Sequence, residues 1–173
     1  MKIVLASDHG GFALKQSLVA FLQAEGHTVL DFGTHSESPV DYPDYAFLVA
    51  ATVASGEAER GIMVDGAGIG SSMVANKVPG IRAALCNDLF AARNAREHNA
   101  ANVLTLGGRI IGIGLAQEIV KIFLATAFAS RHQPRIDKIS GYERDLLRAA
   151  QQTPAPPARV WPAAVPASPG AYR

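Results

Sequence analysis

Short apolar runs alternate along this chain with longer stretches of helical periodicity. The runs are Ile3–Leu5, Val29–Phe32, Gly61–Val64, Arg82–Cys86 and Asn102–Leu106. The helical stretches are Phe12–Leu22, Pro43–Val53, Ser71–Lys77, Asp88–His98, Ala116–Phe128 and Ile136–Ala149. Short strands separated by helices indicate βαβ crossovers, which produce a parallel sheet covered by helices on both faces. The sequence therefore predicts an α/β three-layer sandwich, Rossmann-like or flavodoxin-like, with five parallel strands.

The chain of 173 residues with 49% hydrophobic content is long enough for one compact domain with a core. We expect that domain over residues 1–150, followed by a proline- and alanine-rich tail over residues 151–173. The tail holds six of the ten prolines, and Trp161 lies among them. This composition favours extended polyproline II and predicts a mobile appendage. The alternative is an arm that docks Trp161 onto the body or onto another subunit.

Charge and composition exclude several classes of partner. The net charge is +1 with both signs interspersed, so neither nucleic acid nor a membrane surface is expected as a partner. No apolar run approaches 18 residues, and Asp8 and His9 interrupt the first apolar stretch where a signal sequence would continue. The single cysteine, Cys86, cannot form an internal disulfide. These features predict a cytoplasmic protein.

A glycine-rich loop, Asp65-Gly66-Ala67-Gly68-Ile69-Gly70, follows the third apolar run and precedes a helical stretch. Alternating glycines remove side chains where a strand passes into a helix, so backbone N–H groups can close on an anion. Asp65 places a carboxylate at the mouth of that loop. An anion cradle beside a potential base predicts catalysis on a small phosphorylated or carbonyl-bearing molecule. The alternative is that Asp65 caps the helix that starts near Ile69.

Further polar residues follow the other predicted strands, whose carboxyl ends meet at one edge of a parallel sheet. Asp8-His9-Gly10-Gly11 follows the first strand, and Gly107-Gly108-Arg109 follows the fifth. We expect polar and glycine residues to gather along this edge, where they would form a site.

Five motifs of this chain form a recognisable set: the glycine loop, Asp8-His9-Gly10-Gly11, Asp41-Tyr42-Pro43, Glu97-His98-Asn99 and Arg131-His132-Gln133-Pro134-Arg135. Together they resemble the ribose-5-phosphate isomerase B family, which also includes the subunits of galactose-6-phosphate isomerase. The resemblance runs from Lys2 to about Arg148. It implies an aldose–ketose isomerase without cofactor that acts on open-chain sugar phosphates through a cis-enediolate. Such chemistry can proceed with a base and a backbone oxyanion hole, so no metal is expected.

The resemblance also implies roles for individual residues. Asp8 and His98 resemble the pair that opens the sugar ring and orients the substrate, and Asn99 resembles a ligand of sugar hydroxyls. The backbone of Gly66, Gly68, Ile69 and Gly70, together with Ser71, resembles the anion hole for the enediolate. The resemblance assigns phosphate binding to Arg109, Arg131 and Arg135, with His9 assisting. Tyr42 resembles the aromatic residue that lines the substrate pocket of the family.

The guanidinium group suits phosphate because it is planar and has five donors. Alternatively, Arg131 and Arg135 lie four residues apart and would form an ordinary exposed helix face. Family members are commonly dimers or pairs of dimers with shared sites. The resemblance therefore implies that the segments holding His98 and Arg131–Arg135 serve the glycine loop of a neighbouring subunit.

The chain departs from the family at the proton-transfer base. Many members carry a cysteine where this chain has Asp65, and another branch carries a glutamate where it has Ser71. We predict that Asp65 is the base, because carboxylates are ionised at neutral pH whereas a thiol needs activation. A carboxylate reaches further than a cysteine sulfur, and misplacement on the order of 1 Å can cost about 100-fold in rate. We therefore expect the preferred sugar to have shifted from ribose 5-phosphate or broadened to other tetrose, pentose or hexose phosphates.

Two other functions stay open. One is a catalytically silent family member that binds a sugar phosphate, or one subunit of a hetero-oligomeric isomerase. The other is an unrelated module for a nucleotide or flavin, although the glycine motif follows the third strand and not the first. Among the remaining candidates, His27, His35 and His132 are expected at the surface, and Cys86 is expected as a small core residue.

Overall fold

The computed structural model describes residues 1–152, which contain one five-stranded sheet. Its strands are β1 (Lys2–Ser7), β2 (Thr28–Asp31), β3 (Arg60–Asp65), β4 (Ala83–Leu85) and β5 (Val103–Gly107). The strand order is β2-β1-β3-β5-β4, and every pairing between neighbours is parallel. The five-stranded parallel sheet predicted from the sequence is confirmed.

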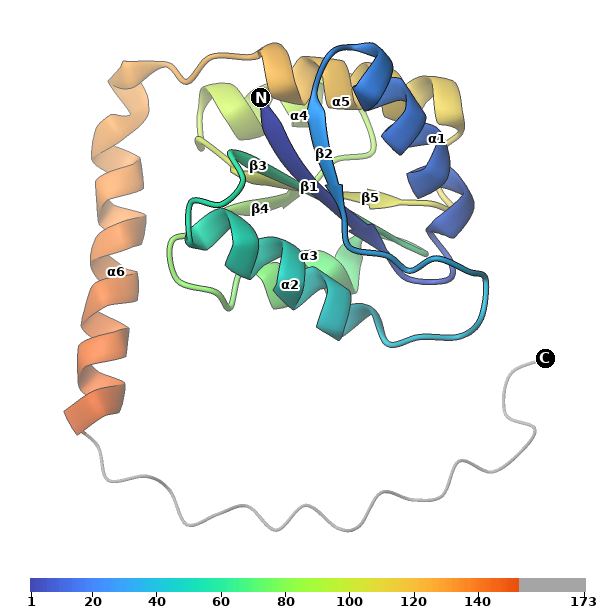
Figure 1. Cartoon of the computed structure of the whole chain (residues 1–173). Helices are drawn as coiled ribbons and strands as arrows, with labels where there is room; N and C mark the ends of the chain where they lie inside the picture. Colours follow the sequence, from blue (N-terminus) through green and yellow to red (C-terminus); the bar gives the residue numbers. More distant parts are fainter. Residues whose placement is uncertain (153–173) are drawn as a thin grey trace, which may run out of the picture.

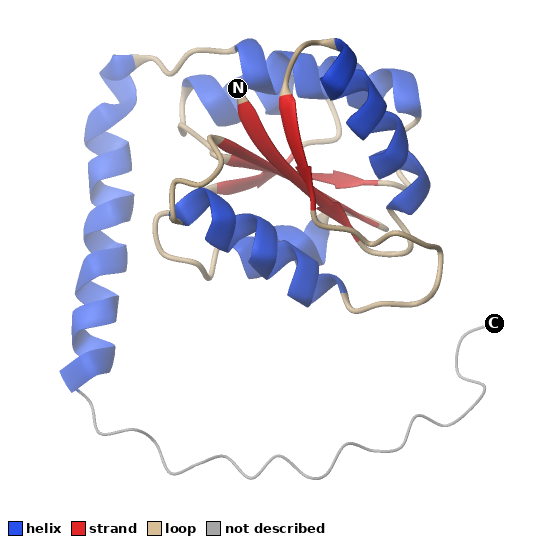
Figure 2. Cartoon of the chain, viewed as in Figure 1, coloured by secondary structure: helices blue, strands red, loops and turns tan. Residues whose placement is uncertain are grey.

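Helices cover both faces of the sheet (Figure 2). One face is packed by α1 (Phe12–Ala24), α4 (Leu89–Glu97) and α5 (Ile113–Ala125). The other is packed by α2 (Tyr42–Ala54) and α3 (Ile69–Ala75). The three-layer sandwich is therefore also confirmed.

Burial on both faces explains the aliphatic strands. Val4 and Met63 point to the layer of α2 and α3, whereas Leu5 and Ile62 point to the layer of α1 and α5. Neighbouring residues of a strand point to opposite faces, so a sheet covered on both sides needs continuous apolar runs.

Local signals explain most helix boundaries. The Asp88 carboxylate accepts a hydrogen bond of 2.7 Å from the Ala91 N–H, so Asp88 caps α4 as expected. The helix expected over Ala116–Phe128 instead begins at Ile113 and ends at Ala125. The periodic pattern marks the buried face, and Ala116 is the first buried residue of α5. Ile113 and Leu115 in the first turn are apolar but exposed, so they lie outside that face.

The last elements are η1 (Ser130–His132) and α6 (Gln133–Gln152). Helix α6 extends away from the sheet (Figure 1), and Ile136 is its one buried residue. Its apolar Ile139, Tyr142 and Leu146 are exposed. The expected domain end at residue 150 falls inside the last turn of α6. The rest of the predicted tail, including Trp161, lies outside the described residues.

Within residues 1–152, none of the helices alone is both long and apolar enough to cross a bilayer. The segments 113–125 and 130–152 meet that criterion only jointly, and they are bent by 82° at the break between them.

Candidate active site

The carboxyl ends of β1 and β3 lie side by side in the middle of the sheet. The chain continues from β1 to β2 on one side, and β3 lies on the other, so this is the point where ligands bind in open α/β sheets. Asp8 follows β1 directly and Asp65 is the last residue of β3. The fold thus places two carboxylates at the usual ligand position.

Glycines allow the loops at this edge to touch through their backbones. A β-carbon at Gly11 would overlap the Val64 carbonyl group, and one at Gly68, whose φ is +78°, would overlap the Leu85 side chain. The Gly108 N–H also donates to the Asp65 carbonyl at 2.7 Å. The three loops therefore form one compact surface.

The Asp65 carboxylate is buried and bonded to its own loop. Its Oδ1 accepts hydrogen bonds from the N–H groups of Ala67, at 2.8 Å, and Gly68. Its Oδ2 accepts from the Ser71 N–H at 3.1 Å and from the Ser71 hydroxyl. A carboxylate has about four lone-pair sites, and four donors occupy them here. This geometry corresponds to the capping alternative and differs from the expectation that Asp65 faces a reacting carbon.

Two N–H groups of the glycine loop lie at the start of helix α3 (Ile69–Ala75). Ile69 and Gly70 lie in the first turn of α3, where backbone N–H groups have no partner within the helix. The Tyr42 ring packs against Gly70, since a β-carbon there would lie 2.6 Å from it. Ser71 is completely buried, so its side chain contacts Asp65 and not open space.

Asp8 lies beside this loop with 8% of its surface exposed. Its Oδ1 accepts a hydrogen bond of 2.9 Å from the Gly11 N–H. Burial raises the pKa of Asp8, the charge of Asp65 adds to the increase, and the Gly11 N–H and His9 oppose it. His9 itself accepts a hydrogen bond of 3.3 Å from the Val40 N–H at Nδ1.

The exposed Arg109 side chain extends past Gly66 and adds a cation to this edge. A β-carbon at Gly66 would lie 3.8 Å from Arg109 Cδ, and the Arg109 N–H donates to the Gly66 carbonyl at 3.1 Å. The structure therefore brings Asp8, His9, Tyr42, Arg109 and the glycine loop to one edge.

The remaining candidates lie at the opposite edge. Helix α4 returns from the carboxyl edge, so His98 and Asn99 lie at the amino end of β5. Helix α5 returns likewise and brings Arg131 and Arg135 there. Since β3 has six residues, the two edges are about 20 Å apart. Within one chain, these four residues do not join the glycine loop.

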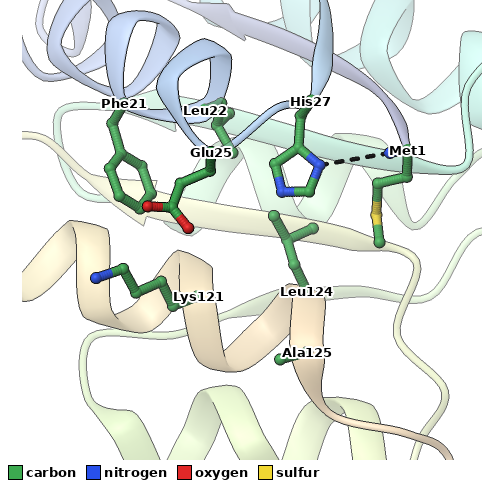
Figure 3. A pocket seen from close by; sticks show the side chains of 8 residues that line it. All are labelled: Met1, Phe21, Leu22, Glu25, His27, Lys121, Leu124 and Ala125. Atoms are coloured by element: carbon green, nitrogen blue, oxygen red, sulfur yellow. Dashed lines mark hydrogen bonds between the residues drawn. The ribbon is translucent and has the colours of Figure 1, made fainter.

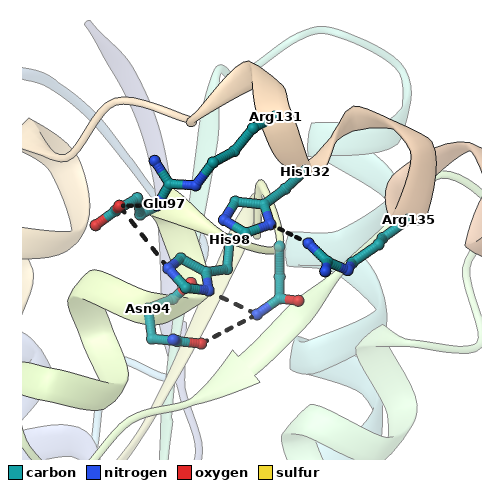
Figure 4. Close-up of polar contacts among 7 residues, drawn as sticks. Asn94, Glu97, His98, Arg131, His132 and Arg135 are labelled. Atoms are coloured by element: carbon teal, nitrogen blue, oxygen red, sulfur yellow. Dashed lines mark hydrogen bonds and ion pairs between the residues drawn. The ribbon is translucent and has the colours of Figure 1, made fainter.

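Figure 4 shows His98, Arg131 and Arg135 close together at the amino edge, with Glu97 and His132 among them. The rings of His98 and His132 stack with centroids 4.1 Å apart. Glu97 Oε1 lies 3.1 Å from Arg131 Nη2 and 3.8 Å from His98 Nε2. The ion pair between Glu97 and Arg131 orders the group. Arg135 adds a second positive charge, so the surface is cationic.

His132 was expected at the surface but is buried. Its Nδ1 lies 2.5 Å from Arg135 Nη1. A guanidinium only donates, so Nδ1 accepts and neutral His132 carries its proton on Nε2. That buried Nε2 has no hydrogen-bond partner in the described part of the chain. Burial lowers the pKa of His132, and the charges of His98, Arg131 and Arg135 lower it further.

His132 lies between Arg131 and Arg135, both predicted phosphate ligands, and this position was the sequence signal that it belongs to the same group. Two further residues, Arg82 and Arg96, support the group, and no sequence signal pointed to them. Arg82 Nε donates to the Asn99 carbonyl and Nη2 to the Ala100 carbonyl, both at 3.0 Å. Arg96 Nη1 donates to the Ala101 carbonyl at 2.6 Å. The two arginines thus hold the turn after His98, in which Ala100 has a φ of +47°.

A pocket of about 390 Å³ lies elsewhere, between α1 and α5 (Figure 3). Its lining is mainly apolar and contains none of the candidate residues; it consists of Met1, Phe21, Leu22, Glu25, His27, Lys121, Leu124 and Ala125. Among residues 1–152, no group of three or more His, Cys, Asp or Glu side chains is arranged to hold a metal ion. The chemistry-bearing residues therefore point to the sheet edges and not to this pocket.

A parallel α/β sheet with a glycine-rich loop and two carboxylates at its carboxyl edge is typical of enzymes that bind a small ligand at that edge. The family model described as Ribose/Galactose Isomerase matches residues 3–139. The chain belongs to this family and is a sugar-phosphate isomerase by class.

Curated relatives cover most of the chain. A putative sugar phosphate isomerase of Bacillus subtilis is 52% identical over 149 residues, which is 85% of this chain and 100% of that protein. The ribose-5-phosphate isomerase B of Escherichia coli is 44% identical over 144 residues, 83% of this chain and 97% of that protein. A D-erythrulose-4-phosphate isomerase of Pectobacterium atrosepticum is 40% identical over 146 residues, 83% of this chain and 95% of that protein.

Solved structures show the same fold. The ribose-5-phosphate isomerase B of Clostridium thermocellum is 50% identical with a TM-score of 0.83, covering 84% of this chain and 99% of that one. The enzyme from Mycoplasma genitalium, with bound ribulose-5-phosphate, is 41% identical with a TM-score of 0.79, covering 83% and 97%.

Proposed function

We propose that this enzyme interconverts an aldose phosphate and a ketose phosphate through a cis-enediolate. Ribose 5-phosphate and ribulose 5-phosphate are the first candidates, followed by other tetrose, pentose or hexose phosphates. The observation that carries the proposal is the meeting of a buried carboxylate, Asp8, with the N–H groups of the glycine loop at one edge. The Escherichia coli and Mycoplasma genitalium enzymes support the pentose, and the Pectobacterium atrosepticum enzyme supports a tetrose.

The reaction needs a base for the proton that moves between C1 and C2, and donors for the oxygen that becomes negative. The carboxylates at the carboxyl edge are Asp8 and Asp65, and the N–H groups of Ile69 and Gly70 supply donors. Arg109 and His9 stand beside this loop, where they would bind the phosphate or sugar oxygens. Tyr42 would form a wall of the pocket.

A second copy of the chain would complete the site. We propose a homodimer or a dimer of dimers in which His98, Asn99, Arg131 and Arg135 of one subunit serve the glycine loop of another. Two observations support sharing: the edges of one chain are separated by the length of a strand, and α6 carries an exposed apolar face. We also propose a cytoplasmic location, where phosphorylated sugars are metabolised.

Two observations favour the second candidate, a silent sugar-phosphate-binding protein or one subunit of a hetero-oligomer. The lone pairs of Asp65 are occupied, and the customary cysteine and glutamate are absent from positions 65 and 71. A catalytic member then needs its base elsewhere.

Incubation in deuterated water with a panel of aldose and ketose phosphates separates the two candidates. An isomerase interconverts at least one pair and incorporates deuterium at C1 or C2, detected by NMR. Binding of a sugar phosphate without interconversion or exchange would support the silent protein and reject the isomerase.

A further inference from the structure

We infer that Asp8, and not Asp65, carries the proton between C1 and C2 of the sugar. The inference rests on the proposed isomerase activity and concerns which of the two neighbouring carboxylates performs it. Both lie at the carboxyl ends of adjacent strands, β1 and β3, so either could reach a substrate bound there.

The surroundings of Asp65 exclude it from this role in the observed geometry. Its four hydrogen bonds all come from the loop between Ala67 and Ser71. To accept a proton from carbon, the carboxylate would have to release one of these donors and leave it unpaired next to buried groups. Asp65 therefore acts as an internal anion that shapes the loop.

By contrast with Asp65, the Asp8 carboxylate keeps lone pairs that can accept a proton. The Gly11 N–H donates to Oδ1, and no side chain in the described part of the chain donates to either oxygen. Burial raises the pKa of Asp8, and the neighbouring negative charge of Asp65 adds to the increase, while the N–H groups of Gly11 and Gly10 and the charge of His9 lower it.

Gly10 lies between the Asp8 carboxylate and the glycine loop. A β-carbon on residue 10 would contact Asp8 Oδ1 at 3.3 Å and the backbone nitrogen of Gly66 at 3.4 Å. Because residue 10 is glycine, no side chain separates the carboxylate from the loop, and Gly10 and Gly66 are both partly exposed. A substrate that lies against Gly10 would therefore have the carboxylate on one side and the glycine loop on the other, as a base and an oxyanion donor require.

The proton transfer balances without any further reactant. The Asp8 carboxylate takes the proton from C2 of the aldose, and the electron pair of that C–H bond forms the C1–C2 double bond. The carbonyl pair moves to O1, which becomes the oxyanion next to the loop N–H groups. The hydroxyl proton on O2 passes to O1. The carbonyl re-forms at C2, and protonated Asp8 returns its proton to C1.

The test must separate this role from ring opening, which the family resemblance implies for Asp8. Ribulose 5-phosphate is a suitable substrate for this test. Its phosphate blocks O5, so the sugar cannot close a furanose ring and needs no ring opening. The measurement is the exchange of C1 hydrogen for deuterium from deuterated water. Asp8→Asn keeps the acceptor for the Gly11 N–H but removes the basic group. We expect this variant to lose exchange by about 10²- to 10⁴-fold, the usual contribution of a general base.

Two controls accompany that variant. Asp44→Asn removes an exposed carboxylate from the first turn of α2 and should exchange like the unmodified protein. Ribitol 5-phosphate, which has no carbonyl group, should bind Asp8→Asn with affinity close to that of the unmodified protein, which shows that the site is folded. Exchange by Asp8→Asn within about 10-fold of the unmodified protein would overturn the inference.

The pH profile of the unmodified protein gives a second measurement that does not depend on a variant. A base must be ionised, so kcat/KM should fall on the acid side with a pKa above 3.8, the ordinary value for Asp. An acid limb at or below 3.8 would contradict the assignment. If the unmodified protein exchanges no sugar of the panel, the proposed function fails; exchange that survives in Asp8→Asn defeats the Asp8 assignment alone.

Discussion

His98 and His132 stack with their ring centroids 4.1 Å apart and their planes inclined by 25°. One ring comes from the end of α4 and the other from η1, so the stack joins segments separated by the whole of β5 and α5. Arg135 donates to His132, and the buried Nε2–H of His132 has no acceptor among residues 1–152. The stack therefore holds the ring position, and the Arg135 hydrogen bond sets the tautomer, of a group that sequence reasoning assigned to solvent.

Stability should fall in mild acid because of His132. Its pKa is lowered in the folded protein, so the unfolded chain binds more protons as the pH drops below about 6.5. The contribution of neutral His132 is complete above that pH and is lost as the pH falls toward the folded-state pKa. Urea denaturation should show a smaller loss between pH 7.5 and 5.5 for His132→Gln than for the unmodified protein. The exposed His35→Gln is the control, and equal losses in all three proteins would contradict the prediction.

Removal of Arg82 should loosen the turn that carries His98 and Asn99. Arg82→Ala takes away hydrogen bonds to two carbonyl groups, and charged donors of this kind contribute about 1.5–3 kcal/mol each when they are buried. Because Arg82 is partly exposed, we expect the free energy of unfolding to fall by about 1–2 kcal/mol. Arg93→Ala, on the exposed side of α4, should change it by less than about 0.5 kcal/mol. Similar values for the two variants would show that the hydrogen bonds of Arg82 contribute nothing to the free energy of unfolding.

Asp65→Asn should destabilise the glycine loop. The amide replaces one acceptor oxygen with a donor, which then faces N–H groups or the Ser71 hydroxyl, and an unsatisfied buried donor costs about 1–3 kcal/mol. Asp88→Asn is the matched control, since Asn caps a helix about as well as Asp. Urea denaturation compares the two variants, and an unchanged midpoint for Asp65→Asn would argue against the network. Undiminished turnover of this variant would also reject Asp65 as the proton-transfer base.

Mixing two inactive variants should restore activity if subunits share their sites. His98→Ala removes a group of the amino edge, and Asp8→Asn removes one of the carboxyl edge. When unfolded chains of both are refolded together in equal amounts, half of the dimers contain one of each, and one site in each mixed dimer is intact. About a quarter of the original activity should return, because an isologous dimer has two equivalent sites. Failure to recover any activity, with mixed dimers demonstrated by mass spectrometry, would indicate that each subunit works alone.

Cys86 should resist alkylation in the native protein. It is buried, and burial together with the charge of Asp88 raises the pKa of its thiol to about 12, so almost no thiolate exists at pH 8. Iodoacetamide at pH 8 should label Cys86 only after denaturation, as measured by intact mass. Rapid labelling of the folded protein would show that this strand end opens.

Several features could be predicted because they depend on neighbours in the sequence. The Asp88 cap requires only a side chain three residues before a backbone N–H, and the glycine loop requires only small residues at a strand end. The five strands appear as apolar runs because both sheet faces are covered. The start of α5 was misplaced by three residues because Ile113 and Leu115, in its first turn, are exposed and lie outside the buried face that the periodic pattern marks.

The sequence by itself determined the strand and helix succession, and hence the α/β sandwich, together with the motifs that mark its family. Only the tertiary structure decided that the four donors to Asp65 come from its own loop, that His132 is buried against His98, and that the candidate residues divide between two edges of the sheet. The physical reason is that periodicity records which face of an element is buried. The direction of a carboxylate and the distance between the ends of different helices depend on how those elements pack.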